Sequence, residues 1–310
     1  MKLSVKIGKT VFPNPVTVAS GTFGHAEKYF NLEEVKKLGA IVPKTVTYHP
    51  QAGNPPVRVT ETPSGMLNAI GIENPGVTEF IRKKLPLFQK IGVPLIISVL
   101  GHTPKQFEGL VRAFNEVEGL AAIELNLSCP NLGHKTLVAQ DPKATRKLVK
   151  KLKTMSRYPL VAKLSPNVTD ITVVARAAED GGADGLSLIN TLTGMVIDVE
   201  KRKSVLGNFT GGLSGPAIRP VALNMVYQTA RSVNIPVIAM GGIASAADAL
   251  QFIIAGASMV AVGTYNFINP RAPLEVLGGI EEYMKRHKMK DIKKLIGSIQ
   301  REEPHSNRAG

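Results

Sequence analysis

The sequence predicts an α/β fold, a (β/α)8 TIM barrel, from three observations. Short apolar runs alternate with amphipathic stretches of helical length along the chain, which is the pattern of repeated βαβ units. Runs such as 235–240 are apolar throughout, as strands buried on both faces of a parallel sheet are. The chain has 310 residues, enough for such a barrel with insertions. An open doubly wound sheet is the alternative, but no GxGxxG motif follows a strand and opens a helix.

The apolar runs predict one strand for each βα unit of the barrel. The expected strands are 16–20, 40–46, 94–100, 121–128, 159–164, 185–190, 236–241 and 258–263. Helical periodicity between them is found, for example, at 32–38, 105–117, 142–155, 170–180, 220–233 and 245–255. Because no second composition regime interrupts this alternation, we expect residues 1–310 to form a single domain.

The opening segment and two long connections lie outside this repeat. The run LSVKIGKTVF predicts a β-hairpin that turns at Gly8-Lys9 and caps the bottom of the barrel. The connections 47–75 and 191–216 are long and rich in Gly and Pro. Both follow strands, so we expect both over the C-terminal face, where barrel active sites assemble. We interpret them as a lid over a site, although a partner contact or a simple insertion would give the same pattern.

Composition is that of a soluble globular protein, with 44% hydrophobic and 20% charged residues. The start of the sequence has no long apolar block, and the apolar runs are too short to span a bilayer. The single cysteine excludes an intramolecular disulfide and an all-cysteine metal site. We therefore expect a cytoplasmic protein with no metal site and no membrane association.

The formal net charge of +14 raises the alternative of a nucleic-acid binder. The Lys and Arg residues are spread over helical segments, and there is no basic–aromatic repeat and no tryptophan. A basic surface facing solvent, a phosphorylated cofactor or an acidic partner explains the charge equally well. We expect no nucleic-acid partner.

The densest group of candidate functional residues follows the expected strand 121–128. Asn126, Cys129 and Asn131 stand in the run Asn-Leu-Ser-Cys-Pro-Asn. An unpaired cysteine is more often a small buried hydrophobic residue, but a position between two amides at a strand end suits that role poorly. A thiol with a pKa of about 8.5 can act as a base where its surroundings favour the thiolate. Cys129 is therefore the candidate catalytic residue.

Polar residues also stand at the ends of other expected strands. Asn68, Asn190 and Thr191 offer donors and acceptors together, which suits the imide and amide edge of a pyrimidine. Asparagine is also common in turns and caps, which is the alternative interpretation. Lys44 and Lys163 interrupt apolar runs, and a lysine in a barrel mouth is costly unless it meets an anion or a reactive carbonyl.

Three interpretations of Lys163 stay open at this point. It can form an ion pair with a barrel acid such as Glu124. It can form the Schiff base of an aldolase. It can also donate to the N1–O2 edge of a reduced flavin and stabilise the negative charge there.

The last quarter of the chain predicts a phosphate site. Gly241-Gly242 ends one expected strand, and Gly263-Thr264 ends the next. Glycine lets backbone N–H groups approach an anion, and a short helix after Gly263-Thr264 would add its positive end. Barrels commonly bind phosphate from the loops after their last two strands. Gly215 offers a further close backbone approach.

With these residues in place, the chain resembles the class 1 dihydroorotate dehydrogenases along nearly its whole length, and most of all the catalytic subunit of class 1B. The resemblance rests on four runs: Asn-Leu-Ser-Cys-Pro-Asn at 126–131, Leu-Asn-Ala-Ile-Gly-Ile-Glu-Asn-Pro-Gly at 67–76, Ile-Asn-Thr at 189–191 and Asn-Phe-Thr-Gly-Gly-Leu-Ser-Gly-Pro-Ala at 208–217. The glycines of the phosphate region complete it. Together these motifs are highly specific, and the cysteine argues for class 1 because class 2 enzymes have serine there.

The resemblance implies oxidation of dihydroorotate to orotate in pyrimidine biosynthesis, with one FMN per chain. Cys129 then matches the base that removes the C5 proton while hydride leaves C6 for flavin N5. The implied FMN contacts are Ser20, Lys44, Thr45, Ser98, Asn126, Lys163, Ile189, Gly215, Gly241, Gly242, Gly263 and Thr264. The implied substrate contacts are Lys44, Asn68, Ala69, Ile70, Gly71, Ile72, Asn126, Asn131, Asn190 and Thr191.

One position, Ser98, departs from the family pattern. Ser98 stands where class 1B chains usually have an asparagine that contacts the flavin.

The resemblance further implies a homodimer and a separate electron-transfer subunit with FAD and a [2Fe–2S] cluster, which passes electrons to NAD+. A chain with one cysteine cannot hold that cluster itself. Fumarate and a quinone remain alternative oxidants.

Other functions remain as alternatives. The tRNA dihydrouridine synthases are FMN barrels with a similar Asn–Cys–Pro motif, but they have glycine where this chain has Ser128 and append a helical RNA-binding domain, which we do not expect after Asn269. Dihydropyrimidine dehydrogenases carry iron–sulfur domains of their own. A non-catalytic barrel that binds a phosphorylated ligand would need no base beside that ligand.

Overall fold

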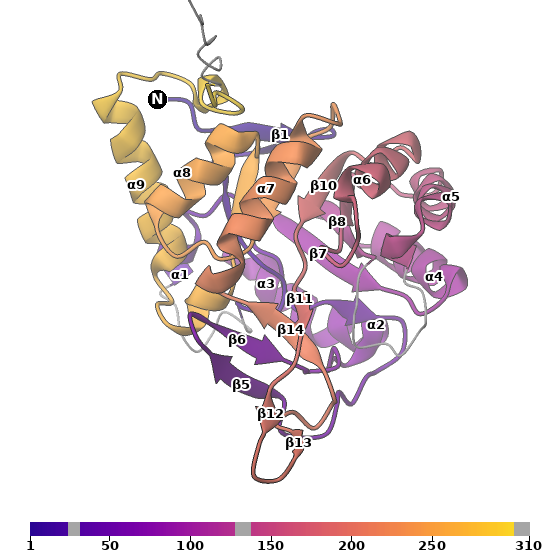
Figure 1. Ribbon diagram of the computed structural model, residues 1–310. Helices are drawn as coiled ribbons and strands as arrows, with labels where there is room; N and C mark the ends of the chain where they lie inside the picture. The colour runs from indigo at the N-terminus through magenta and orange to yellow at the C-terminus, as the bar shows by residue number, and fades with distance from the viewer. Residues whose placement is uncertain (24–31, 128–137, 301–310) are drawn as a thin grey trace, which may run out of the picture.

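The computed structural model describes residues 1–23, 32–127 and 138–300, and its centre is an eight-stranded parallel sheet (Figure 1). In order around the sheet the strands are β3 (Val16–Val18), β16 (Met259–Val262), β15 (Val237–Met240), β10 (Gly185–Leu188), β9 (Leu160–Lys163), β8 (Leu120–Asn126), β7 (Leu95–Leu100) and β4 (Val46–Thr47). Each lies within, or within one residue of, an expected strand. The order and the direction of the strands confirm the predicted barrel.

The two ends of this sheet meet at the segment before β4. The backbone N–H of Gly39 donates to the carbonyl of Val16 over 2.8 Å. The hydroxyl of Thr17 donates to the carbonyl of Ala40 over 2.9 Å. On the other side of the same segment, Ile41 forms a parallel bridge with Leu95 of β7. The expected strand 40–46 therefore closes the barrel, although its regular part is shortened to β4.

Helices alternate with the strands and lie outside the sheet (Figure 1). The α-helices are α1 (Leu32–Val35), α2 (Gly76–Glu79), α3 (Leu85–Ile91), α4 (Pro104–Asn115), α5 (Pro142–Lys153), α6 (Ile171–Asp180), α7 (Arg219–Ala230), α8 (Ala246–Ala255) and α9 (Ala272–Arg286). A π-helix, η1 (Phe80–Lys84), joins α2 to α3, and the 3-10 helices are η2 (Val138–Gln140), η3 (Pro216–Ile218), η4 (Thr264–Phe267) and η5 (Ile292–Lys294).

Capping side chains determine where several of these helices begin. Asp170 accepts the backbone N–H of Thr172 at the start of α6. Ser245 and Asp248 form a reciprocal capping box at the start of α8. The expected helices 170–180 and 245–255 thus begin at their capping residues, and the regular helix follows one residue later.

The N-terminal hairpin lies at the end of the barrel where the strands begin. It consists of β1 (Val5–Ile7) and β2 (Thr10–Phe12), and it turns at Gly8, whose φ is 53°. Ile7 is fully buried. The hydroxyl of Thr10 donates to the carbonyl of Ala121, near the start of β8, over 2.8 Å. These contacts confirm that the hairpin caps the bottom of the barrel.

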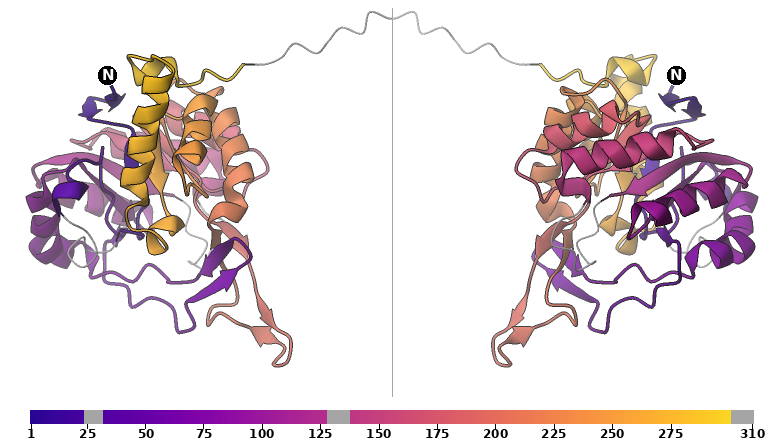
Figure 2. Two further views of the ribbon diagram at one scale, coloured as in Figure 1. Left: turned by 90° about the vertical axis from the view of Figure 1, so that its left-hand side faces the viewer. Right: turned by 90° about the vertical axis from the view of Figure 1, so that its right-hand side faces the viewer.

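The two long connections pair with each other at the opposite end of the barrel. They form a four-stranded antiparallel sheet in the order β11 (Leu192–Gly194), β14 (Gly211–Ser214), β6 (Gly65–Asn68) and β5 (Val59–Thr62). A short hairpin, β12 (Ile197–Asp198) and β13 (Lys203–Ser204), extends from this sheet away from the barrel (Figures 1 and 2). The predicted location over the C-terminal face is confirmed, but this sheet was not expected.

The core fills the barrel and the space between strands and helices. All six residues of β7 and all seven of β8 are buried. In the described ranges, no helix is both long enough and apolar enough to cross a membrane. Buried polar groups appear inside the barrel towards the C-terminal ends of its strands, among them Ser98, Glu124, Lys163 and Ser187. This is the end where the cavity opens.

Candidate functional site

A cavity of about 630 Å³ lies at the C-terminal ends of the barrel strands, between the barrel and the four-stranded sheet. Its walls come from segments far apart in the sequence. The predicted site residues that line it are Ser20, Lys44, Thr45, Asn68, Ile70, Ile72, Asn126, Lys163, Ile189, Asn190, Thr191, Gly215, Gly241, Gly242, Gly263 and Thr264. The volume is in the range typical of a small-molecule or cofactor site.

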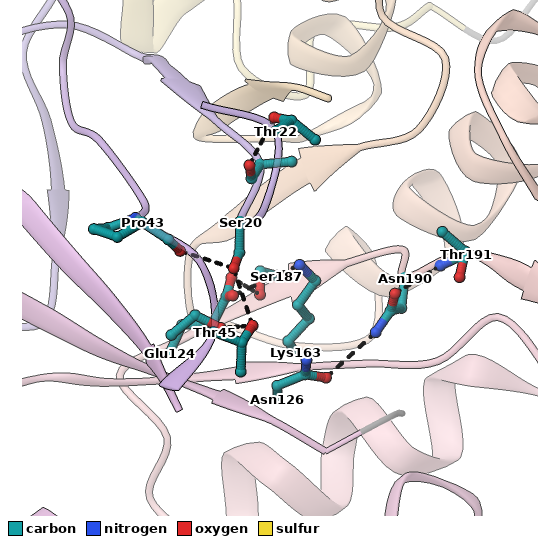
Figure 3. Close-up of polar contacts among 12 residues, drawn as sticks. Ser20, Thr22, Pro43, Thr45, Glu124, Asn126, Lys163, Ser187, Asn190 and Thr191 are labelled. Carbon is teal, nitrogen blue, oxygen red and sulfur yellow. Dashed lines mark hydrogen bonds and ion pairs between the residues drawn. The ribbon is translucent and has the colours of Figure 1, made fainter. Parts of the chain in front are cut away.

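Lys163 lines this cavity from the last position of β9, with a buried acid behind it. Its Nζ lies 3.6 Å from Oε1 of Glu124, and the two side chains are 7% and 3% exposed. Glu124 Oε2 accepts a hydrogen bond of 2.8 Å from the Ser187 hydroxyl on β10. Figure 3 shows the three side chains grouped together inside the barrel. The ion pair that the sequence left as one interpretation of Lys163 is therefore present, at the cavity itself.

Three hydroxyl groups form a second polar group: Ser20 follows β3, Thr45 precedes β4 and Ser98 is on β7. Ser20 donates to the carbonyl of Pro43 over 2.9 Å. Ser20 and Thr45 hydroxyl oxygens are 3.0 Å apart, and so are those of Thr45 and Ser98. Because a hydroxyl has one proton to donate, Thr45 must donate to Ser20 and accept from Ser98. Ser98 is 1% exposed and lies behind Thr45, outside the cavity lining.

Amide side chains are concentrated on another wall. The amide nitrogen of Asn190 donates to Oδ1 of Asn126 over 3.3 Å, which Figure 3 shows as a dashed line. Asn190 Oδ1 in turn accepts the N–H of Thr191 over 2.8 Å. Asn68, on β6 of the four-stranded sheet, donates to the carbonyl of Gly212 over 3.3 Å. The sheet formed by the two long connections thus brings Asn68 to the same cavity as the barrel asparagines.

A buried asparagine organises the loop after β6. Asn74 Oδ1 accepts the N–H groups of Thr47 and Gly76, and its amide nitrogen donates to the carbonyl of Ile72 over 2.8 Å. Ile70 and Ile72 line the cavity, whereas Ala69 is fully buried. Ala69 and Gly71 are not among the lining residues. Of the predicted substrate contacts in this loop, Asn68, Ile70 and Ile72 therefore line the cavity, and Ala69 and Gly71 do not.

The glycines of the predicted phosphate site form a narrow cradle. Gly242 has a φ of +76°, and a Cβ atom there would lie 2.7 Å from Arg219 Cβ and 2.9 Å from the carbonyl oxygen of Gly215. A Cβ atom would collide with these two residues, so only glycine fits at this position, and its backbone lines the cavity. Asp248 accepts the N–H groups of Ala244 and Ser245 and forms an ion pair with Arg219, which fixes the loop from behind.

The second half of the predicted phosphate site follows β16. The 3-10 helix η4 begins directly after Gly263, which confirms the short helix expected there. The Thr264 hydroxyl donates to the Ser214 hydroxyl over 2.8 Å, so the barrel and the four-stranded sheet are joined at this point. Both glycine segments therefore face the same end of the cavity.

Lys44 reaches the cavity beside a tight turn after β3. Gly21 has a φ of +83°, and a Cβ atom there would lie 3.3 Å from both Cδ and Nζ of Lys44. The lysine side chain therefore lies along the backbone of this turn.

Two predicted residues, Cys129 and Asn131, lie outside the described residues. Several cavity residues were not predicted: Ala19, Gly21, Thr22, Val59, Met66, Ser214, Ile218, Met240 and Phe267. Most are apolar, and their chemistry gives no indication of a site. Gly21, Thr22 and Ser214 each stand within two residues of a predicted site residue, and Ser214 also stands in the run 208–217 that carries the resemblance. Among the residues of the three described ranges, no group of His, Cys, Asp and Glu could hold a metal ion.

Comparison with known proteins identifies related sequences along almost the entire chain. The family model for dihydroorotate dehydrogenase matches residues 2–284. Proteins named dihydroorotate dehydrogenase B (NAD(+)), catalytic subunit, are similar to the chain. The one from Trichlorobacter lovleyi is 48% identical over 299 residues, which cover 96% of this chain and 98% of the relative. The one from Lachnoclostridium phytofermentans is 49% identical over 300 residues, which cover 96% of this chain and 100% of the relative.

Proposed function

Since the chain belongs to the dihydroorotate dehydrogenase family, we propose that it oxidises dihydroorotate to orotate, as the catalytic subunit of an NAD+-linked enzyme of pyrimidine biosynthesis. The observation that carries the proposal is a single cavity at the C-terminal ends of the strands. It is lined by Lys163, by amides from both the barrel and the four-stranded sheet, and by the glycine cradle. This combination suits a phosphorylated planar cofactor together with a ligand rich in amide groups.

The cavity fits FMN in two respects. Gly241, Gly242 and Gly263 line the cavity through backbone atoms alone, so their N–H groups can approach a phosphate without an intervening side chain. At the other end, Lys163 offers a buried cation to the N1–O2 edge of a flavin. We propose that residues 1–310 form one FMN-binding barrel domain, with Ser20, Thr45, Ile189, Gly215, Gly241, Gly263 and Thr264 also in contact with the cofactor. Ser98 would act on the flavin only through Thr45.

The substrate would lie against the amides. Asn68, Asn126 and Asn190 provide donors and acceptors for the ring of dihydroorotate, and Lys44 provides a positive charge for its carboxylate. We propose that Asn131 and Thr191 also form hydrogen bonds with the ring of dihydroorotate. FMN would supply N5 as the acceptor of the hydride from C6. We assign removal of the C5 proton to Cys129, because this residue closely follows Asn126 at the end of β8.

Electrons must leave the chain for the cycle to continue. The relatives' name, a catalytic subunit of an NAD(+) enzyme, supports a separate subunit that transfers electrons. We propose that this subunit contains FAD and a [2Fe–2S] cluster, since the single cysteine of this chain cannot hold one. We also propose a cytoplasmic location, where dihydroorotate and NAD+ would both be available.

Anaerobic addition of dihydroorotate to the purified chain tests the proposed function. We expect the protein to contain one FMN per chain and the oxidised flavin absorbance to bleach rapidly, because hydride transfer to the flavin needs no other subunit. We expect no rapid reduction of NAD+ until the electron-transfer subunit is added. Bound flavin is identified by mass spectrometry after release, and bleaching is followed by stopped-flow absorbance.

The same experiment separates the alternatives. A chain that contains FMN but is bleached by dihydrouridine in tRNA, and not by dihydroorotate, would be a dihydrouridine synthase. A chain without flavin would support the non-catalytic barrel or, if borohydride trapped a carbonyl substrate on Lys163, the aldolase. Rapid NAD+ reduction by the isolated chain would contradict the need for a second subunit.

Exposed apolar side chains of the two long connections support a homodimer. We call residues 195–209, which include β12 and β13, the arm. Ile197, Val199 and Phe209 of the arm are 54%, 75% and 71% exposed, and the neighbouring Val57 is 49% exposed. The backbone N–H of Gly207 donates to the carbonyl of Val57, so the arm lies beside the segment that holds Val57. Exposed apolar groups that cluster in this way are typical of a protein–protein interface.

Replacing Val199 with glutamate is expected to weaken the dimer by a factor on the order of 100. In a symmetric interface the substitution places two carboxylates against apolar surface, and a factor of 100 corresponds to about 2.8 kcal/mol in total, or about 1.4 kcal/mol for each. Sedimentation velocity over a range of concentrations measures the dissociation constant. Val173→Glu is the matched control, because Val173 is 41% exposed on α6, far from the arm. A Val199→Glu protein that dimerises as tightly as the control would contradict the proposed interface.

A further inference from the structure

Glu124 is a buried acid that the proposed chemistry does not use. It lies on β8 and is 2% exposed, and it is not among the residues that line the cavity. The strand register places it beside Ser98 on β7 and Val161 on β9. Its carboxylate is directed into the barrel towards Lys163 and Ser187 (Figure 3). A charged group inside a barrel core is costly, so its presence calls for a physical reason.

The two carboxylate oxygens have different surroundings. Oε2 accepts the Ser187 hydroxyl over 2.8 Å. Among the described residues Oε1 has no hydrogen-bond partner, and Lys163 Nζ lies 3.6 Å from it. This separation is longer than a charge-assisted hydrogen bond but still a strong electrostatic contact in a buried site. The ammonium group is thus attracted by Glu124 from below while it faces the cavity above.

We propose that Glu124 is a positioning residue that determines how much of the Lys163 positive charge acts on a flavin in the cavity. The inference rests on the proposed function, since it concerns the cofactor assigned to this cavity. A carboxylate close to the ammonium offsets part of its field, and Ser187 weakens that offset by donating to the carboxylate. Because reduced flavin is negative at its N1–O2 edge, the balance of these two groups sets the flavin reduction potential.

The test measures the FMN midpoint potential and the dissociation constant for sulfite, which adds to oxidised flavin and places negative charge on the same edge. Glu124→Gln keeps the size of the side chain and removes its charge. We expect a higher potential and roughly tenfold tighter sulfite binding, since the loss of one nearby charge shifts such equilibria by about one log unit. Ser187→Ala should change both quantities in the opposite direction, because it leaves the carboxylate less compensated.

Two comparisons separate this role from a general disturbance of the core. Thr229→Val replaces a fully buried threonine of α7 that does not line the cavity, and it should leave both quantities unchanged. In a Lys163→Met background, Glu124→Gln should tighten sulfite binding less than in the unaltered chain, because only the direct field of the carboxylate is then lost and there is no ammonium group left to release. A shift as large in this background as in the unaltered chain would overturn the inference, since Glu124 would then not act through Lys163.

The outcomes also separate this inference from the proposed function. If the unaltered chain does not bind FMN, the proposed function fails. If it binds FMN but Glu124→Gln and Ser187→Ala leave the potential and the sulfite dissociation constant unchanged, the role of Glu124 is refuted alone. If Glu124→Gln does not fold, Ser187→Ala decides the question: unchanged sulfite binding in that variant overturns the inference.

Discussion

Replacing Cys129 with serine is expected to slow flavin bleaching by dihydroorotate about 100- to 10,000-fold near neutral pH, which is the usual contribution of a positioned base. Serine keeps the shape of the side chain but is a much weaker acid than a thiol, so far less of it is ionised. The remaining rate should therefore rise as the pH is raised. Stopped-flow absorbance of the oxidised flavin under anaerobic conditions measures the rate at each pH.

Cys129→Ala is the matched control for this pH profile. Alanine has no ionisable group, so its remaining rate should stay low at alkaline pH while that of serine rises. Both variants must retain FMN at the level of the unaltered chain for the comparison to hold. A Cys129→Ser protein that bleached as fast as the unaltered chain at neutral pH would show that another group removes the C5 proton.

The barrel was predictable because its strands stand out in the sequence as short runs that are mostly apolar. Runs such as 235–240 are apolar at every position, and only a strand covered on both faces buries all of them. The expected strand 40–46 is shorter in the structure, because Pro43 has no N–H to donate and its carbonyl accepts the Ser20 hydroxyl instead of a strand partner. The local apolar pattern thus predicts where the strands lie, but not how many of their residues form regular strand.

The four-stranded sheet was not predictable from local pattern. Its central pairing joins Gly212 to Asn68 and Leu213 to Leu67, residues that are far apart in the sequence. β14 contains two glycines, and glycine is depleted in strands. Its strand conformation therefore depends on tertiary pairing rather than on intrinsic preference. The same pairing brings Asn68 into the cavity. The sequence therefore predicted Asn68 as a site residue but did not predict the sheet that holds it.

The site residues divide in the same way. Polar and glycine residues at strand ends, such as Asn126, Lys163 and Gly242, are marked by their chemistry, and the structure brings them to one cavity. Apolar lining residues such as Met66 and Phe267 carry no comparable mark. Ser98 was predicted from its position alone, and its place behind Thr45 depends on a hydrogen bond between side chains that sequence spacing does not encode.

Replacing Lys163 with methionine is expected to lower the free energy of unfolding of the FMN-free protein by about 3–5 kcal/mol. The lysine and Glu124 side chains are 7% and 3% exposed, so the substitution leaves a buried carboxylate without its counter-ion. Adding Glu124→Gln to the same protein removes that charge and should restore most of the loss. Urea denaturation of the flavin-free single and double variants measures both free energies.

An exposed ion pair provides the comparison for this effect. Lys36 and Glu33 are 2.6 Å apart, with side chains that are 47% and 74% exposed, so Lys36→Met should cost less than about 1 kcal/mol. The two costs differ because of solvent. Water replaces the lost partner of Glu33, whereas inside the barrel the Ser187 hydroxyl is the one hydrogen-bond donor that the described residues leave to Glu124. If the single and double variants were equally destabilised at neutral pH, the loss would come from packing, and the buried charge would not be its cause.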